Sequence, residues 1–114
     1  MNDVCDFSNK HCVPCEGGVD SIDRDSAEKM LADVTGWTLS DDGKMISRRF
    51  EFKGFLSTMS FINAMAWLVN RENHHPDFSA GYNYCDVGFT THAIDGLSEN
   101  DFICAARVNA LVES

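Results

Sequence analysis

A stripe of apolar residues at helical spacing in the middle of the chain restricts the possible folds more than any other feature. The intervals between its members are four, three, four and three residues: Phe55, Met59, Ile62, Ala66 and Val69. This spacing predicts one long helix, from about residue 55 to residue 71, with a continuous apolar face. A second group widens the stripe: Phe61, Met65 and Leu68. We therefore expect the helix to lie flat on a sheet as part of the core.

Strand-like segments flank this helix on both sides. Residues 37–40 and 45–52 enclose the sequence Asp41-Asp42-Gly43, which is typical of a hairpin turn. Residues 77–80 and 84–91 follow Pro76 and predict a second pair, with Cys85, Val87 and Phe89 on one face.

A short helix is predicted at each end of this pattern. The first begins after Asp23 as its N-cap, with these apolar positions: Ala27, Met30, Leu31 and Val34. The last opens at Ser98 with a capping box in which Asp101 stands where Glu or Gln is usual. We expect its buried side to consist of Ile103, Ala106, Ala110 and Leu111.

The resulting order is α-β-β-α-β-β-α, with short connections. It predicts an α+β fold in which three helices pack on one face of a four-stranded antiparallel sheet. A chain of 114 residues is long enough for one core. We expect a single domain over residues 21–114, preceded by an extended lead-in over residues 1–20.

Charge and hydropathy exclude several classes of function. Nine basic and eighteen acidic side chains give a net charge of −9, which disfavours nucleic acid as a partner. The longest apolar run, Ala64 to Val69, is far shorter than the ~20 residues of a membrane helix. The first residues have neither a basic region nor an apolar stretch, so we expect no signal peptide and a cytoplasmic protein.

The five cysteines form two groups. Cys12 and Cys15 make a Cys-x-x-Cys pair, which with Cys5 or His11 could form half of a zinc site or a redox pair. No second Cys-x-x-Cys is present and the pair does not follow a strand, so a reduced segment that packs on the domain is the favoured interpretation. Cys85 and Cys104 are predicted to be small core residues.

Three of the four histidines lie at the ends of predicted elements. His74 and His75 follow the long helix, and His92 follows the last strand. Histidine has an ordinary pKa of ~6.5, so rings around one pocket could act as general acid and base. A shared zinc ion is a weaker alternative, because adjacent histidines point in different directions and no standard ligand set completes the site. The motifs of serine nucleophiles, phosphate loops and dinucleotide sites are absent from the sequence.

A resemblance to a known family covers nearly the whole chain. The segments that carry it are His11 to Gly18, Gly36-Trp37, Phe50 to Phe55, Asn73-His74-His75-Pro76-Asp77, Tyr82-Asn83, Thr91-His92 and Gly96 to Asp101. Together they resemble the pterin-4a-carbinolamine dehydratase family. The resemblance implies dehydration of 4a-hydroxytetrahydropterins to quinonoid dihydropterin, which recycles the pterin cofactor of aromatic amino acid hydroxylases. It also implies a homodimer or homotetramer of the α+β fold described above and no metal or organic cofactor.

Residue by residue, the resemblance implies three catalytic histidines: His74, His75 and His92. It also implies substrate contacts from Asn73, Thr90, Thr91 and Ala93, with Asn70 and Pro76 as a possible second layer. Loss of the 4a-hydroxyl as water and of the N5 proton requires an acid and a base. We expect His74 and His92 to fill these two roles and His75 to orient the ring.

Two further expectations concern the limits of this assignment. Asn70 stands where the family often has glutamate, so a negative charge that would raise the pKa of a neighbouring histidine is missing; we expect the acidic limb of the pH–rate profile to lie lower than in relatives with the glutamate. Asp101 is left out of the site because its capping role accounts for it. The alternative to an enzyme is a non-catalytic dimerisation or protein-interaction module of the same fold, as in family members that bind a transcription factor.

Overall fold

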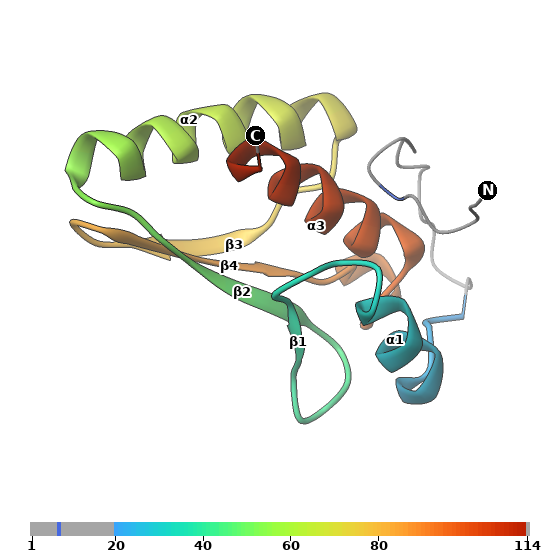
Figure 1. The fold of residues 1–114 in the computed structure, drawn as a ribbon. Coiled ribbons are helices and arrows are strands. Elements are labelled where there is room, and N and C mark those ends of the chain that lie inside the picture. Colours follow the sequence, from blue (N-terminus) through green and yellow to red (C-terminus); the bar gives the residue numbers. More distant parts are fainter. Residues whose placement is uncertain (1–6, 8–19, 114) are drawn as a thin grey trace.

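The structure is a computed structural model that describes Phe7 and residues 20–113 (Figure 1). Its elements are α1 (Arg24–Leu31), β1 (Thr38–Leu39), β2 (Ile46–Glu51), α2 (Phe55–Glu72), β3 (Asp77–Ala80), β4 (Tyr84–Phe89), the 3₁₀ turn η2 (His92–Ile94) and α3 (Glu99–Val112). The strands form one antiparallel sheet in the order β1-β2-β4-β3. The predicted α+β class and element order are confirmed. The predicted lead-in, apart from Phe7 and Asp20, lies outside the described residues.

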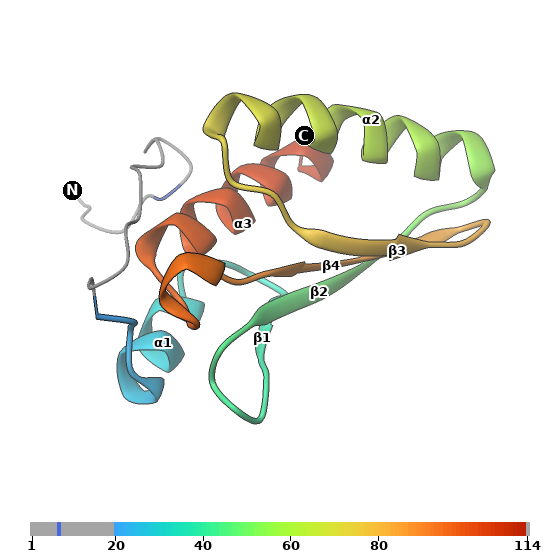
Figure 2. The ribbon, with the colours of Figure 1, turned by 180° about the vertical axis from the view of Figure 1, so that it is seen from behind.

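The core lies between the sheet and the helices above it. In Figures 1 and 2, α2 and α3 cover the same face of the sheet, and α1 lies beside β1. Alternate residues of the two central strands point into this core: Ile46, Phe50, Cys85, Val87 and Phe89. Cys85 and Cys104 are both buried in the core, as predicted. Within the described residues, no helix is long and apolar enough to cross a membrane.

The buried face of α2 agrees with the predicted one at Ile62, Val69 and the group that widens the stripe, but not at Phe55 and Ala66. Phe55 is 57% exposed and Ala66 is also exposed, whereas the buried residues are Thr58, Phe61, Ile62, Met65, Leu68 and Val69. Both faces of this helix carry apolar side chains, so periodicity alone selects neither. Contact with α3 and the sheet determines which face is buried. That face includes the group that was predicted to widen the stripe: Phe61, Met65 and Leu68.

The two other helices also depart from the prediction. Helix α3 buries its first half on several sides, while Ala110 is exposed and Leu111 is 39% exposed. The reason is that α3 begins inside the core, where Phe102 contacts Phe7, and ends outside it. Helix α1 ends at Leu31 rather than at residue 34, and Val34 reaches the core from the turn that follows.

Arg48 interrupts the apolar face of β2, and the structure shows how it is accommodated. Its guanidinium lies 4.4 Å from the centre of the Phe50 ring. The same group donates to Asn109 Oδ1 at 2.6 Å and to the Thr35 carbonyl at 3.0 Å. Trp37 Nε1 donates to the same Asn109 oxygen at 2.8 Å. A buried amide on α3 thus supplies the partner that a charged side chain on the inner face requires.

Several helices and strands begin or end at the same end of the sheet. Asp77, the first residue of β3, pairs with Gly88 near the end of β4. The last turn of α2 precedes β3, and α3 starts a few residues after β4, so both helices have an end here (Figures 1 and 2). This arrangement brings the two histidine-bearing segments to the same end of the molecule.

Candidate active site

The segment that carries His74 and His75 is set by the way α2 ends. Asn73 caps the helix in the left-handed conformation, with φ 54° and ψ 39°. Its N–H donates to the Asn70 carbonyl, and the His74 N–H donates to the Val69 carbonyl, each at 3.2 Å. Asparagine is one of the few residues that adopt this conformation readily. The predicted substrate contact at Asn73 therefore also has a structural role, which is to turn the chain so that His74 faces α3.

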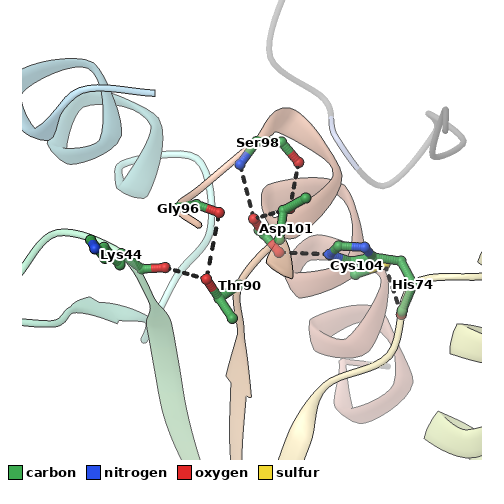
Figure 3. A network of polar contacts seen from close by, with 8 residues as sticks. Lys44, His74, Thr90, Gly96, Ser98, Asp101 and Cys104 are labelled. Carbon is green, nitrogen blue, oxygen red and sulfur yellow. Dashed lines mark hydrogen bonds and ion pairs between the residues drawn. The ribbon is translucent and has the colours of Figure 1, made fainter. Parts of the chain in front are cut away.

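His74 is held tightly on two sides. Its Nε2 lies 2.6 Å from Asp101 Oδ1, and its side chain is 12% exposed (Figure 3). Its ring is nearly parallel to the ring of Phe89, with an interplanar angle of 11° and 6.0 Å between the centroids. A carboxylate only accepts hydrogen bonds, so Nε2 carries the hydrogen and Nδ1 is the nitrogen left for other chemistry.

Asp101 connects this histidine to the segment after β4. Its side chain is fully buried, and its Oδ2 accepts from the Ser98 N–H at 2.9 Å (Figure 3). The same oxygen accepts from the Thr91 hydroxyl at 2.8 Å. The predicted capping box is confirmed, but capping uses only one of the two carboxylate oxygens. Capping therefore does not account for Asp101 fully, because its other oxygen contacts His74. The signal was available in the sequence: a short acid stands at the third position of a helix whose next residues, Phe102 and Ile103, are strongly apolar.

Contacts with Gly96 on one side and with Lys44 on the other hold the segment from Thr90 to Ala93 in place. Thr91 forms an isolated bridge with Gly96, and its N–H donates to the Gly96 carbonyl at 2.9 Å. The Thr90 hydroxyl donates to the Lys44 carbonyl (Figure 3), and Lys44 Nζ lies 2.9 Å from Asp95 Oδ2. This ion pair raises the pKa of Lys44 through the hydrogen bond and charge of Asp95. His92 and Ala93 follow at the start of η2, with both residues exposed.

The remaining predicted residues lie on another side of the same segment. His75, Asn70 and Pro76 line a hollow of about 520 Å³ between the outer side of α2 and the edge strand β3. His75 is exposed, whereas His74 is turned inward. The structure thus brings His74 and the segment from Thr90 to Ala93 together through Asp101, and places His75 beside them on a separate surface.

A larger hollow, of about 910 Å³, lies elsewhere. Residues of β2, the first half of α2 and the end of α3 line it, and none of the predicted site residues is among them. Its lining is mainly apolar, apart from Arg48, Arg49, Glu51 and two serines. Acid–base chemistry needs titratable side chains that can give or take a proton near neutral pH, and the histidines supply them. We therefore place the candidate site at the histidines rather than at the larger hollow.

Metal binding has no geometric basis in the part of the chain that the structure describes. No group of three or more His, Cys, Asp or Glu residues there is arranged to hold an ion. The alternative built on Cys5, Cys12, Cys15 and His11 lies outside the described residues. The candidate site consists of the His74 imidazole in contact with the buried carboxylate of Asp101. The hydroxyl groups of Thr91 and Ser98 lie next to this carboxylate.

Comparison with solved structures defines the class of protein. The domain resembles a transcriptional coactivator/pterin dehydratase from Brucella melitensis, with a TM-score of 0.77 and 29% identity over 81% of this chain and 98% of that one. It also resembles a pterin dehydratase-like protein described as a RuBisCO assembly factor in the alpha-carboxysome, with a TM-score of 0.61 and 29% identity over 69% of this chain and 92% of that one. The fold is therefore that of a pterin dehydratase-like domain.

Sequence comparison then identifies the family. Residues 20–111 match the family model described as pterin 4 alpha carbinolamine dehydratase, so the chain belongs to that family. A relative from Nitrosomonas europaea, named "Putative pterin-4-alpha-carbinolamine dehydratase", is 52% identical over the full length of both chains. A relative of the same name from Legionella pneumophila (strain Lens) is 48% identical over 94% of this chain and 96% of its own.

Proposed function

We propose that this protein is a 4a-hydroxytetrahydropterin dehydratase, a hydro-lyase that converts the pterin 4a-carbinolamine to quinonoid dihydropterin. Family membership supports the substrate class. The observation that carries the proposal is the bridge made by Asp101, whose two oxygens contact His74 Nε2 at 2.6 Å and the Thr91 hydroxyl at 2.8 Å. One buried carboxylate thereby fixes the two segments that bear the candidate acid and base.

The reaction needs two proton transfers. The bond between C4a and the hydroxyl oxygen breaks and the oxygen leaves as water, which requires a proton from an acid. N5 gives its proton to a base as the double bond between C4a and N5 forms. Each positioned transfer typically contributes about 10²–10⁴-fold to the rate. No oxidant or reductant takes part, because the elimination of water leaves the electrons balanced.

The geometry suggests how these roles are divided. Asp101 keeps the hydrogen of His74 on Nε2, so that Nδ1 presents a lone pair and can accept the N5 proton. The imidazolium that forms is then stabilised by the adjacent carboxylate, as a carboxylate stabilises the base in hydrolase triads. His92, exposed at the start of η2, is the candidate acid for the leaving hydroxyl. His75, on the neighbouring surface, is the candidate group that orients the ring.

The test measures the loss of a 4a-hydroxytetrahydropterin with wild-type protein and with His74→Ala, each against the rate without protein. We expect wild-type activity that falls by about 10²–10⁴-fold in the variant. The matched control is Tyr82→Ala, which removes an exposed ring from the β3–β4 turn at the opposite end of the sheet (Figure 1). Equal activity in wild type and His74→Ala would exclude His74 as the base.

A non-catalytic interaction role is the second candidate. The observation in its favour is the exposed apolar surface of α2, where Phe55, Leu56 and Trp67 are 57%, 80% and 66% exposed. Absence of turnover by wild-type protein would favour this role over the enzyme. We further propose a cytoplasmic homodimer or homotetramer that acts in the recycling of a pterin used by an aromatic amino acid hydroxylase, as expected from the family.

A further inference from the structure

The loop that carries His92 receives little support from the core. This loop, residues 90–96 and called the η2 loop below, connects β4 to α3, and none of the three residues of η2 is buried. Its own hydrogen bonds close it: the Thr91 N–H donates to the Gly96 carbonyl at 2.9 Å, and the Ile94 N–H donates to the Thr91 carbonyl at 3.2 Å. A turn without buried side chains keeps its place through polar contacts with its neighbours. The position of His92 therefore depends on the residues that hold the η2 loop from outside.

One residue of the β1–β2 hairpin contacts the η2 loop at both of its ends. The Lys44 carbonyl accepts a hydrogen bond from the Thr90 hydroxyl, before η2 (Figure 3). The Lys44 ammonium lies 2.9 Å from Asp95 Oδ2, after η2. The hairpin and the loop lie at the same end of the two central strands, where Ile46 pairs with Phe89. Lys44 thus spans the loop that contains the candidate acid.

Lys44 is itself held by the hairpin turn. Its N–H donates to Asp42 Oδ1 at 3.0 Å, and the Ser40 hydroxyl donates to the same oxygen at 2.6 Å. The Met45 N–H donates to Ser40 Oγ at 3.1 Å. Gly43 supplies the left-handed conformation of the turn, with φ 72°. The hairpin therefore presents Lys44 to the η2 loop in a defined position.

Asp95 connects Lys44 to the backbone of His92. It ends η2 in the left-handed conformation, with φ 50° and ψ 49°, which aspartate adopts more readily than most residues. Its N–H donates to the His92 carbonyl at 3.2 Å. The hydrogen bond from the Thr91 hydroxyl to Asp101 holds the start of the loop on the side of α3. The ion pair with Lys44 holds its end.

We propose that Lys44 is a positioning residue for His92; the inference rests on the proposed dehydratase function, in which His92 is the candidate acid. Elimination of water needs the acid and the base on one substrate together, so the His92 imidazole must keep its place relative to His74. The ion pair itself is exposed, with exposed fractions of 49% for the Lys44 side chain and 86% for the Asp95 side chain. Exposed ion pairs contribute little to the stability of a fold. We therefore expect the loss of this pair to lower kcat and to leave the free energy of unfolding unchanged.

The experiment removes the ion pair from each side in turn. Lys44→Met removes the ammonium and keeps the carbonyl that accepts from Thr90, and Asp95→Asn keeps a residue that adopts the left-handed conformation. Because a misplacement of about 1 Å can cost about 10²-fold in rate, we expect kcat for a 4a-hydroxytetrahydropterin to fall by about tenfold in each variant, with KM unchanged. The double variant should be no slower than either single variant, because both remove the same interaction. Lys44→Arg keeps the charge and should restore kcat to within about twofold of the wild-type value.

The matched control is Lys53→Met. Lys53 is an exposed lysine that follows β2 at the end where this strand pairs with the start of β4, so it lies at the other end of the sheet from η2. We expect this variant to keep the kcat and KM of wild-type protein. A loss of kcat as large as that in Lys44→Met would overturn the inference, because removal of any exposed lysine would then have the same effect.

Amide hydrogen exchange supplies a readout that does not depend on turnover. The Asp95 N–H and the Gly96 N–H both donate within the η2 loop, to the carbonyls of His92 and Thr91. In Lys44→Met we expect both to exchange about two- to fivefold faster, which corresponds to the loss of an exposed ion pair. The N–H groups of β2 and β4 should keep their wild-type exchange rates.

The outcomes separate failure of this inference from failure of the proposed function. Unchanged exchange at Asp95 and Gly96 in Lys44→Met would overturn the inference whatever the activity. Turnover with unchanged kcat in that variant, or with a rise in KM alone, would overturn the positioning role and leave the dehydratase intact. Additive losses in the double variant would show that Lys44 and Asp95 act independently, and would also overturn it. Failure of wild-type protein to turn over the pterin would overturn both proposals.

Discussion

The sharpest test of the site is Asp101→Asn. The carboxylate of Asp101 accepts three hydrogen bonds, from the Ser98 N–H, the Thr91 hydroxyl and His74 Nε2. An asparagine has one acceptor oxygen. If that oxygen keeps the bonds from Ser98 and Thr91, its NH₂ group faces His74, and two N–H groups oppose each other unless the imidazole moves its hydrogen to Nδ1.

The expected effects on activity and stability can be separated. With the hydrogen on Nδ1, His74 cannot accept the N5 proton, so we expect kcat to fall by about 10²–10⁴-fold, the contribution typical of a positioned base. KM should change little, because Asp101 is fully buried. A neutral amide replaces the charged carboxylate in all three hydrogen bonds, and bonds to charged groups contribute more, so the free energy of unfolding should fall by about 1–3 kcal/mol. The measurements are steady-state dehydration kinetics and urea unfolding.

The matched control, Ser98→Ala, removes a neighbouring hydrogen bond and leaves the tautomer of His74 unchanged. In Ser98→Ala the hydroxyl that lies 2.7 Å from Thr91 Oγ1 is lost, while Asp101 and His74 remain. We expect a loss of about 0.5–2 kcal/mol, typical of an N-cap, with kcat retained. A folded Asp101→Asn protein with kcat within about tenfold of wild type would refute the reasoning. So would a loss of kcat in Ser98→Ala as large as that in Asp101→Asn.

Three further predictions concern other parts of the structure. Asn70→Glu would place a carboxylate one helical turn before His74, and because a carboxylate favours the protonated form of a neighbouring imidazole, the acidic limb of the pH–rate profile should move to higher pH; an unmoved profile would contradict this. Burial raises the pKa of the Cys85 thiol above its ordinary 9.0, so the unfolded chain ionises first as pH rises, and the free energy of unfolding should decline above about pH 9 in wild type more than in Cys85→Ala. Asn109→Ala leaves the buried Trp37 N–H without its acceptor and should cost about 1–3 kcal/mol in urea unfolding; a smaller loss than in the exposed-surface variant Asn63→Ala would contradict it.

The order of elements was predictable because local signals agreed along the chain. Asp41-Asp42-Gly43 predicts a hairpin, Pro76 ends the long helix region, and Ser98 with Asp101 marks the start of a helix; each is found where expected. These signals act over a few residues and depend little on tertiary contacts. The sheet order β1-β2-β4-β3 was not among the predictions, because it depends on pairing between distant strands.

The buried faces of the helices were less predictable, for a physical reason. Helix α2 carries apolar residues on more than one side, so a stripe through Phe55 and a stripe through Phe61 fit the helical period equally well. The sheet and α3 determine which stripe is covered. A similar limit applies to α3, where the environment changes along the helix from the core at Phe102 to the surface at Leu111.

The role of Asp101 shows how a local explanation that is correct can still be incomplete. A buried carboxylate is costly unless donors surround it, and the first turn of a helix offers unpaired N–H groups and the positive end of the helix dipole. At the start of α3 these donors stabilise a negative charge at a fully buried position. The same charge can then hold the hydrogen of His74 on Nε2 at 2.6 Å. Capping is therefore the condition that allows a carboxylate to act on the histidine at this position, so the structural and the proposed catalytic role of Asp101 depend on the same hydrogen bonds.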